Sequence, residues 1–234
     1  MNRKLLFGAL AGMAAAATMQ TATANVISLD FEGINATYPS GYAFINGFYN
    51  GGTSSDGTSG PNYGIAFPTN AQAICLNTIG TSCSNTSRGG QGDPNSQLGA
   101  LFFLSGGSTF LNAAAGFDTG LSFNYTAINV GGSINVWSGL NGTGSLLASL
   151  SLPVTTSGPC DGYGAGFCPF FADGVGFAGT AQSVEFVGVS NQIVFDDVTF
   201  GSTTPGHVPE PGTLLLLGGG MAAAGFARQR RKTA

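Results

Sequence analysis

The chain has 234 residues, and its charge is divided unevenly along the sequence. Six of the seven Lys and Arg residues lie near the two ends, whereas residues 25–207 contain ten acidic residues and a single basic one, Arg88, which leaves that region at −9. Nucleic acids and anionic lipid surfaces are bound mainly through Lys and Arg, so the composition excludes both as partners of this region. Divalent cations and neutral sugars remain compatible with it.

Residues 1–24 have the three parts of a secretory signal peptide. A basic start with Arg3 and Lys4 precedes an apolar run over residues 5–19, and Ala-Thr-Ala at 22–24 supplies the small residues before a cleavage point. We therefore expect a signal helix that is removed on export, so that the mature chain begins at Asn25. Retention as an N-terminal anchor is the alternative.

The mature chain begins with an alternating pattern. Residues 27, 29 and 31 are apolar and residues 28, 30 and 32 are polar, which is the period of a half-buried strand. Similar runs, bounded by turn-forming residues, predict strands along the rest of the chain. The expected strands cover residues 26–32, 42–45, 64–67, 71–76, 98–104, 121–126, 133–137, 145–152, 174–179, 183–189 and 192–200.

Turn-forming residues separate these strands. Residues 50–64 and 77–96 are rich in Gly, Ser, Thr and Asn and predict long surface loops, and Asn141-Gly142 marks a hairpin. No segment of the mature region has a convincing amphipathic-helix pattern. Residues 25–202 therefore predict one all-β domain, a two-sheet β-sandwich with jelly-roll topology, and residues 203–207 a linker.

The four cysteines form two local pairs. Cys75 and Cys83 enclose seven residues, as do Cys160 and Cys168. An even number of cysteines in an exported chain favours disulfides, and we predict Cys75–Cys83 and Cys160–Cys168 because each loop closes locally. Three connectivities are formally open, and a zinc site is the rival interpretation.

Catalytic side chains are scarce in the mature region. The only histidine, His207, lies in the linker, and residues 25–207 contain no lysine. Ser-His-Asp, Cys-His and Ser-Lys nucleophile sets are therefore excluded from the domain. Paired carboxylates are the one catalytic class left. We predict a domain that is not an enzyme and needs no cofactor, and the alternative is a secreted carbohydrate-active hydrolase.

Four acids suggest one metal site. Asp30 and Glu32 fall on the polar face of the first predicted strand, and Asp196 and Asp197 interrupt the last one. First and last strands are often neighbours in jelly rolls, so these carboxylates would converge on Ca²⁺, which prefers oxygen ligands. A structural calcium bound by these four acids is one hypothesis. Solvated, outward-facing acids are the interpretation that the pattern favours, because adjacent strand residues point to opposite faces.

Aromatic side chains in exposed loops are candidates for stacking on sugar rings. Tyr63 and Tyr163 lie in Gly-rich loops, and Trp137 lies in a predicted strand. All three are candidate ligand-stacking residues, although for Trp137 we favour burial in the core, because it lies in a strand.

The last 27 residues contain three features in order. Val208, Pro209, Glu210 and Pro211 form a rigid extended peptide, because Pro fixes φ and lacks an N–H. Residues 213–227 form an apolar segment that predicts a short transmembrane helix, of roughly 22 Å against a hydrocarbon core of ~30 Å. A basic stop-transfer end stays in the cytoplasm under the positive-inside rule. Its charged residues are Arg228, Arg230, Arg231 and Lys232.

This order of motif, helix and basic tail resembles the PEP-CTERM sorting signal, also known as the ice-binding-protein C-terminal motif. The resemblance covers residues 206–234 and implies processing by exosortase, a membrane-embedded transpeptidase, through an inner-membrane intermediate. It also implies delivery to the cell surface or exterior, often into extracellular polysaccharide. We therefore predict an exported surface or matrix protein whose sandwich binds carbohydrate. The alternatives are the hydrolase and an ice- or surface-binding module.

Overall fold

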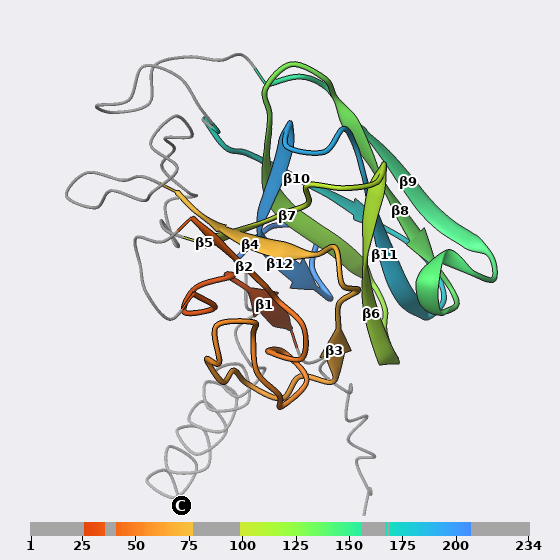
Figure 1. Cartoon of the computed structure of the whole chain (residues 1–234). Coiled ribbons are helices and arrows are strands. Elements are labelled where there is room, and N and C mark those ends of the chain that lie inside the picture. The colour runs from red at the N-terminus through yellow and green to blue at the C-terminus, as the bar shows by residue number, and fades with distance from the viewer. Residues whose placement is uncertain (1–25, 36–40, 77–98, 156–166, 168, 207–234) are drawn as a thin grey trace, which may run out of the picture.

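The computed structural model describes residues 26–35, 41–76, 99–155, 167 and 169–206. Within these ranges the chain forms strands and one 3₁₀ turn, η1 (Leu140–Gly142), and contains no α-helix. The strands form two antiparallel sheets (Figure 1). One sheet has seven strands: β1 (Ile27–Leu29), β2 (Tyr42–Phe44), β4 (Gln72–Cys75), β5 (Gly99–Phe102), β7 (Gly120–Ala127), β10 (Phe171–Gly176) and β12 (Ile193–Phe200). The other has five: β3 (Ile65–Ala66), β6 (Ser108–Phe117), β8 (Gly132–Trp137), β9 (Leu146–Leu152) and β11 (Ala181–Val187).

The chain crosses repeatedly between the two sheets. The seven-stranded sheet has the order β10-β7-β12-β5-β4-β2, with β1 also paired to β12. The five-stranded sheet has the order β3-β6-β11-β8-β9. From β5 to β8 and again from β9 to β12, successive strands belong to alternate sheets, so that β12 pairs with β5 and β7, and β11 pairs with β6 and β8.

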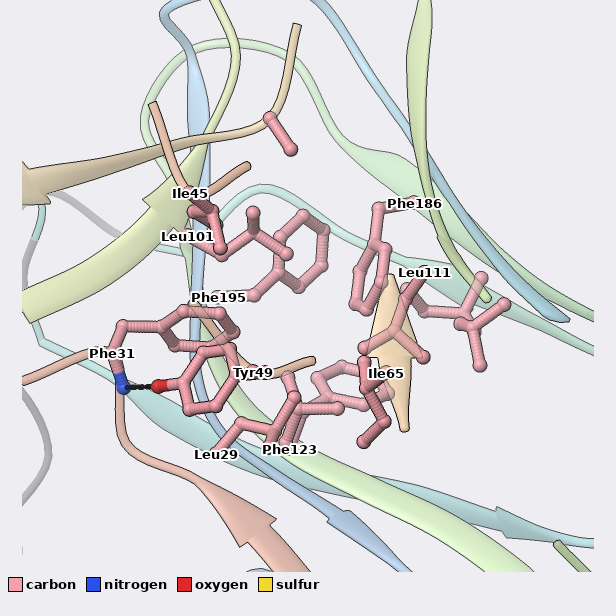
Figure 2. Close-up of a cluster of buried hydrophobic side chains, with 14 of the residues drawn as sticks. Leu29, Phe31, Ile45, Tyr49, Ile65, Leu101, Leu111, Phe123, Phe186 and Phe195 are labelled. Atoms are coloured by element: carbon pink, nitrogen blue, oxygen red, sulfur yellow. Dashed lines mark hydrogen bonds between the residues drawn. The ribbon is translucent and has the colours of Figure 1, made fainter. Parts of the chain in front are cut away.

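One hydrophobic core joins the two sheets. Phe123 and Phe195 of the seven-stranded sheet lie opposite Leu111 and Phe186 of the five-stranded sheet (Figure 2). The rings of Phe186 and Phe195 contact each other with centroids 4.8 Å apart. Each large apolar side chain that is buried in this way contributes about 1.5–3 kcal/mol to folding. Two antiparallel sheets with a shared core are the layers of a β-sandwich.

Most predicted strands are present, with shifted ends. The predicted first strand is wrong at its C-terminal end, because β1 stops at Leu29. Phe31 adopts φ +54°, which turns the chain and brings its ring into the core although the period of two is broken. Glu32 therefore does not lie on a strand face. First and last strands are neighbours as predicted, since β1 pairs with β12.

The longest strand, β6, is missing from the predicted set. Its sequence ends in Asn-Ala-Ala-Ala-Gly-Phe, and Ala and Gly have little preference for strands. The Asn-Gly hairpin, in contrast, is confirmed: β8 pairs with β9, and Asn141 occupies the left-handed region at φ 54°, ψ 40°. The segments predicted as signal helix, transmembrane helix and Asn77–Ser96 loop lie outside the described residues. No helix in the described part of the chain is long and apolar enough to cross a membrane.

Candidate ligand-binding site

A cavity of about 460 Å³ opens between the two sheets along β3. We call it the tyrosine cavity, because Tyr63 is its one tyrosine among the described residues that line it. Strands of both sheets form its walls. The lining consists of Ile27, Tyr63, Gly64, Ile65, Ala113, Ala115, Gly116, Phe117, Asp118, Thr180, Phe200 and Gly201.

Small residues on β6 make room for this cavity. Ala113, Ala115 and Gly116 all line the cavity, in a part of β6 where its register with β11 shifts. Gly116 has φ +76°, and a Cβ at this position would overlap the side chain of Thr180. The Ala- and Gly-rich end of β6, which weakens its strand signal in the sequence, is therefore the part that leaves space for a ligand.

The local backbone fixes the position of Tyr63. Its N–H donates to the carbonyl of Tyr49 at 2.9 Å, and the next residue, Gly64, turns the chain with φ +68°. The Gly64 N–H donates to the side chain of Asn62 at 3.2 Å. Because the peptide is held at these points, the Tyr63 ring is presented to solvent, with 44% of its surface exposed.

A buried tyrosine supports the exposed one from below. The rings of Tyr49 and Tyr63 are stacked, with an interplanar angle of 13° and centroids 6.2 Å apart. The Tyr49 hydroxyl accepts a hydrogen bond of 2.9 Å from the Phe31 N–H, as the dashed line in Figure 2 shows. Tyr49 also contacts the rings of Phe48 and Phe67. The exposed ring therefore rests on a packed aromatic base and loses little freedom when a ligand stacks on it.

The cavity combines an aromatic ring, an apolar floor and one acid. Ile27, Ile65 and Phe200 supply apolar surface, and Asp118 lies at the turn after β6. Oxygen Oδ1 of Asp118 accepts a hydrogen bond of 3.1 Å from the Thr119 hydroxyl. Sugars have apolar C–H faces and hydroxyl edges, so a ring and a carboxylate in one hollow suit their shape. Asp118 is the residue that sequence reasoning missed, and its signal was weak because Asp in a Gly-flanked turn is common.

The acids predicted to bind calcium lie in different surroundings. Asp30 is exposed, and its Oδ1 accepts a hydrogen bond from the Glu32 N–H at 3.2 Å. Glu32 Oε1 accepts from the Gly99 N–H at 3.0 Å. Asp196 and Asp197 are buried, at an irregularity in β12 where Asp197 has φ +45°. The described residues contain no group of three or more acidic, Cys or His side chains that could hold a metal ion, and the structural calcium stays a hypothesis.

The remaining predicted site residues are only partly described. Trp137 ends β8 and is half-buried, with its Nε1 atom inside the protein, and it does not line the tyrosine cavity. Tyr163 lies outside the described residues, as do Cys83, Cys160 and Cys168. Cys75 is buried at the end of β4 and is not a free thiol. The two pairings, Cys75–Cys83 and Cys160–Cys168, stay predictions.

The fold and the cavity define a class: an all-β protein of two antiparallel sheets with an aromatic-lined hollow between them. The C-terminus adds a sorting signal. Residues 207–232 match the family model of the PEP-CTERM protein-sorting motif, so the chain carries this sorting signal. The signal marks exported proteins that are processed by exosortase, a membrane enzyme, and it includes the predicted residues Val208 to Pro211. No curated protein matches the chain.

Proposed function

We propose that the chain is an exosortase substrate that reaches the cell surface or the extracellular matrix, where its β-domain binds polysaccharide without cleaving it. The sorting part rests on the match at residues 207–232. In this account Pro209, Glu210 and Pro211 are recognised by the processing enzyme. The apolar segment that follows holds the chain in the inner membrane until processing, and the basic end marks the cytoplasmic side.

Mutation of the motif tests the sorting part. The double variant Glu210→Ala, Pro211→Ala removes the charge and one of the rigid residues, and we expect it to accumulate unprocessed in the inner membrane. Gln229→Ala, an uncharged change in the basic tail, serves as the matched control. Fractionation and immunoblotting report the distribution of both. Normal surface delivery of the double variant would contradict the proposal.

We infer further that the domain is a jelly roll. In that fold eight strands alternate between two sheets with the orders first-eighth-third-sixth and second-seventh-fourth-fifth. Counted from β5 to β12, the observed orders β5-β12-β7-β10 and β6-β11-β8-β9 fit this scheme. Strands β2 and β4 then extend one sheet beyond β5, β3 extends the other beyond β6, and β1 pairs with β12. Jelly rolls occur in lectin domains, which supports the binding role by analogy alone.

The single observation that carries the binding proposal is the exposed Tyr63 ring over a cavity of about 460 Å³. The region around the cavity is poor in positive charge, since Lys and Arg are absent from the described part of the chain. A neutral sugar is therefore a better ligand than an acidic one, because the overall negative charge repels anions.

The tyrosine cavity favours binding over hydrolysis. A glycosidase needs two carboxyl groups, about 5–5.5 Å or 6.5–9.5 Å apart depending on its stereochemistry. Among the described residues that line the cavity, Asp118 is the one acid. A glycan array probed with the exported protein, with a parallel assay for new reducing ends, tests this. We expect neutral glycans to be bound and none to be cleaved. Release of reducing ends that stops in Asp118→Asn would favour the hydrolase.

A further inference from the structure

A second cavity, of about 430 Å³, lies at the opposite edge of the five-stranded sheet, where the chain leaves β9 beside β10. We call it the carboxylate cavity. Residues of β7 and β10 form one wall, and the segment after β9 forms the other. Its main lining residues are Tyr125, Pro153, Val154, Thr155, Phe171 and Asp173.

The pairing of β10 with β7 brings an aromatic ring and an acid onto one face. Phe171 pairs with Tyr125 and Asp173 pairs with Phe123, so the side chains of Tyr125, Phe171 and Asp173 share a face of the sheet. Phe171 is 46% exposed, whereas Tyr125 is buried. Two strand residues on one face are about 7 Å apart. The ring of Phe171 and the carboxylate of Asp173 are therefore within the span of one sugar ring and its substituent.

The opposite wall is held in position by hydrogen bonds. The Thr155 N–H donates to the Ala127 carbonyl at 2.9 Å, and the Ala127 N–H donates to the Thr155 hydroxyl at 3.0 Å. A third hydrogen bond joins the hydroxyl groups of Thr126 and Thr155, whose oxygen atoms are 2.8 Å apart. Because the segment is pinned to the end of β7, the cavity is built before any ligand arrives.

Electrostatics inside the cavity favour a cation. The Asp173 carboxylate is oriented by the Gly174 N–H, which donates to its Oδ1 at 2.8 Å. Burial, and then the charge of Asp173, raise the pKa of Tyr125, so its phenol stays neutral. The Tyr125 hydroxyl donates only a long bond of 3.4 Å to the Pro153 carbonyl. The described part of the chain contains no Lys or Arg that would neutralise Asp173.

We propose that the carboxylate cavity binds an amino-sugar unit with a free, protonated amine. The ammonium group pairs with Asp173, and the sugar ring lies on Phe171, whose π-face also attracts the positive charge. An amino sugar carries its amine on the ring, so both contacts form with one rigid group. A lysine side chain would have to order four rotatable bonds to reach the same position, which costs more conformational entropy. The carboxylate cavity is separate from the tyrosine cavity. The amino-sugar proposal can therefore fail while the proposed binding of neutral sugars at the tyrosine cavity holds, and the reverse is also true.

Titration calorimetry of the exported protein at mildly acidic pH tests the proposal, with a tetramer of glucosamine and its fully N-acetylated counterpart as ligands. The two have the same rings and differ in charge. We expect the amine form to bind about tenfold more tightly or better, as a charge-assisted hydrogen bond predicts. Asp173→Asn keeps an acceptor for the Gly174 N–H but should lose this preference. Asp56→Asn, an exposed acid in a loop outside the cavity, should keep it.

A second measurement, made on the wild type, tests the proposal even if Asp173→Asn does not fold. In the wild type, affinity for the amine form should fall as the pH rises through the pKa of the amine, whereas affinity for the acetylated form should not change. Equal binding of the two ligands, or a preference that persists in Asp173→Asn, would overturn the proposal. A third ligand is lysine with an acetylated α-amine and an amidated carboxyl group, which keeps its charged side-chain ammonium. If this probe binds as tightly as the glucosamine tetramer, the proposal is overturned in favour of a peptide ligand.

Discussion

Gly99 lies at the start of β5, where the backbone of Phe31 and Glu32, in the turn that follows β1, passes close to it. Its N–H donates to Glu32, and a Cβ at this position would overlap the carbonyl oxygen of Phe31. The Phe31 backbone cannot move away easily, because its N–H is bonded to the buried Tyr49 hydroxyl. A glycine is therefore required here by close approach of two backbones.

Gly99→Ala should destabilise the protein by about 1–3 kcal/mol, the usual cost of overpacking. Urea denaturation gives the free energy of unfolding. Gly107→Ala is the matched control, since a Cβ there meets no atom within 4 Å, and its effect should be small. Wild-type stability in Gly99→Ala would show that the contact with Phe31 relaxes freely.

Tyr125 should make the protein sensitive to alkaline pH. Burial, and then the charge of Asp173, raise its folded pKa above the ordinary value of 10.0, so the folded state holds the proton more tightly than the unfolded state. Its contribution to stability is fully present below pH 10.0 and is lost as the pH rises through the folded pKa.

Tyr125→Phe should therefore flatten the fall in melting temperature on the alkaline side of pH 10.0, where the wild type loses stability. Thermal unfolding followed at several pH values on both sides of that point provides the measurement. An equally steep fall in the variant would mean that other groups control alkaline unfolding.

At the scale of single elements, the turn between β8 and β9 depends on a left-handed residue. Asn141 has φ 54° and ψ 40°, and its N–H donates to the Asn112 side chain at 2.7 Å. Asn141→Val should cost about 1–2 kcal/mol, because a β-branched residue is strained in that region. Asn141→Gly, which adopts it freely, should be much milder, although it loses the side-chain bond from Asn112. Chemical denaturation of both variants compares them, and equal losses would argue against backbone strain as the cause.

The sequence predicts where the strands lie better than it predicts which strands pair with each other. Alternation located β8, β9 and β12 to within a few residues, because period two reports burial on one face. It missed β6, where small residues leave the tyrosine cavity open. It also could not show that every residue of β7 is buried or that β7 pairs with the distant strands β10 and β12, because packing and pairing depend on other parts of the chain.

The candidate site was also predictable only in part, because the sequence reports local features but not which distant residues meet. A Gly-rich loop indicates an exposed Tyr63, as the structure has it. Asp118 comes from another part of the chain and reaches the same cavity only through the pairing of β3 with β6. The left-handed Phe31 ends the first strand early, which the alternation could not show, because a pattern of polar and apolar residues does not report φ.

At the scale of the whole molecule, the sorting signal and the β-domain occupy different parts of the chain. Six of its seven Lys and Arg residues lie near its ends, and the sorting motif occupies residues 207–232. The region between them is acidic and contains two sheets with a cavity at each edge of the smaller sheet. A negatively charged domain does not adhere to anionic cell surfaces, so specific sugar contacts would determine where it is retained.

Calorimetric titration of the exported protein with a neutral oligosaccharide that is bound on the array tests the central claim most directly. We expect saturable binding in the wild type, weakened about tenfold or more in Tyr63→Ala, because the stacking surface is lost. Ala115→Leu should also weaken it, because a larger side chain fills the tyrosine cavity. Tyr42→Ala removes a comparably exposed ring, 49% against 44%, outside the cavity and should bind like the wild type. Unchanged affinity in both Tyr63→Ala and Ala115→Leu would contradict the account.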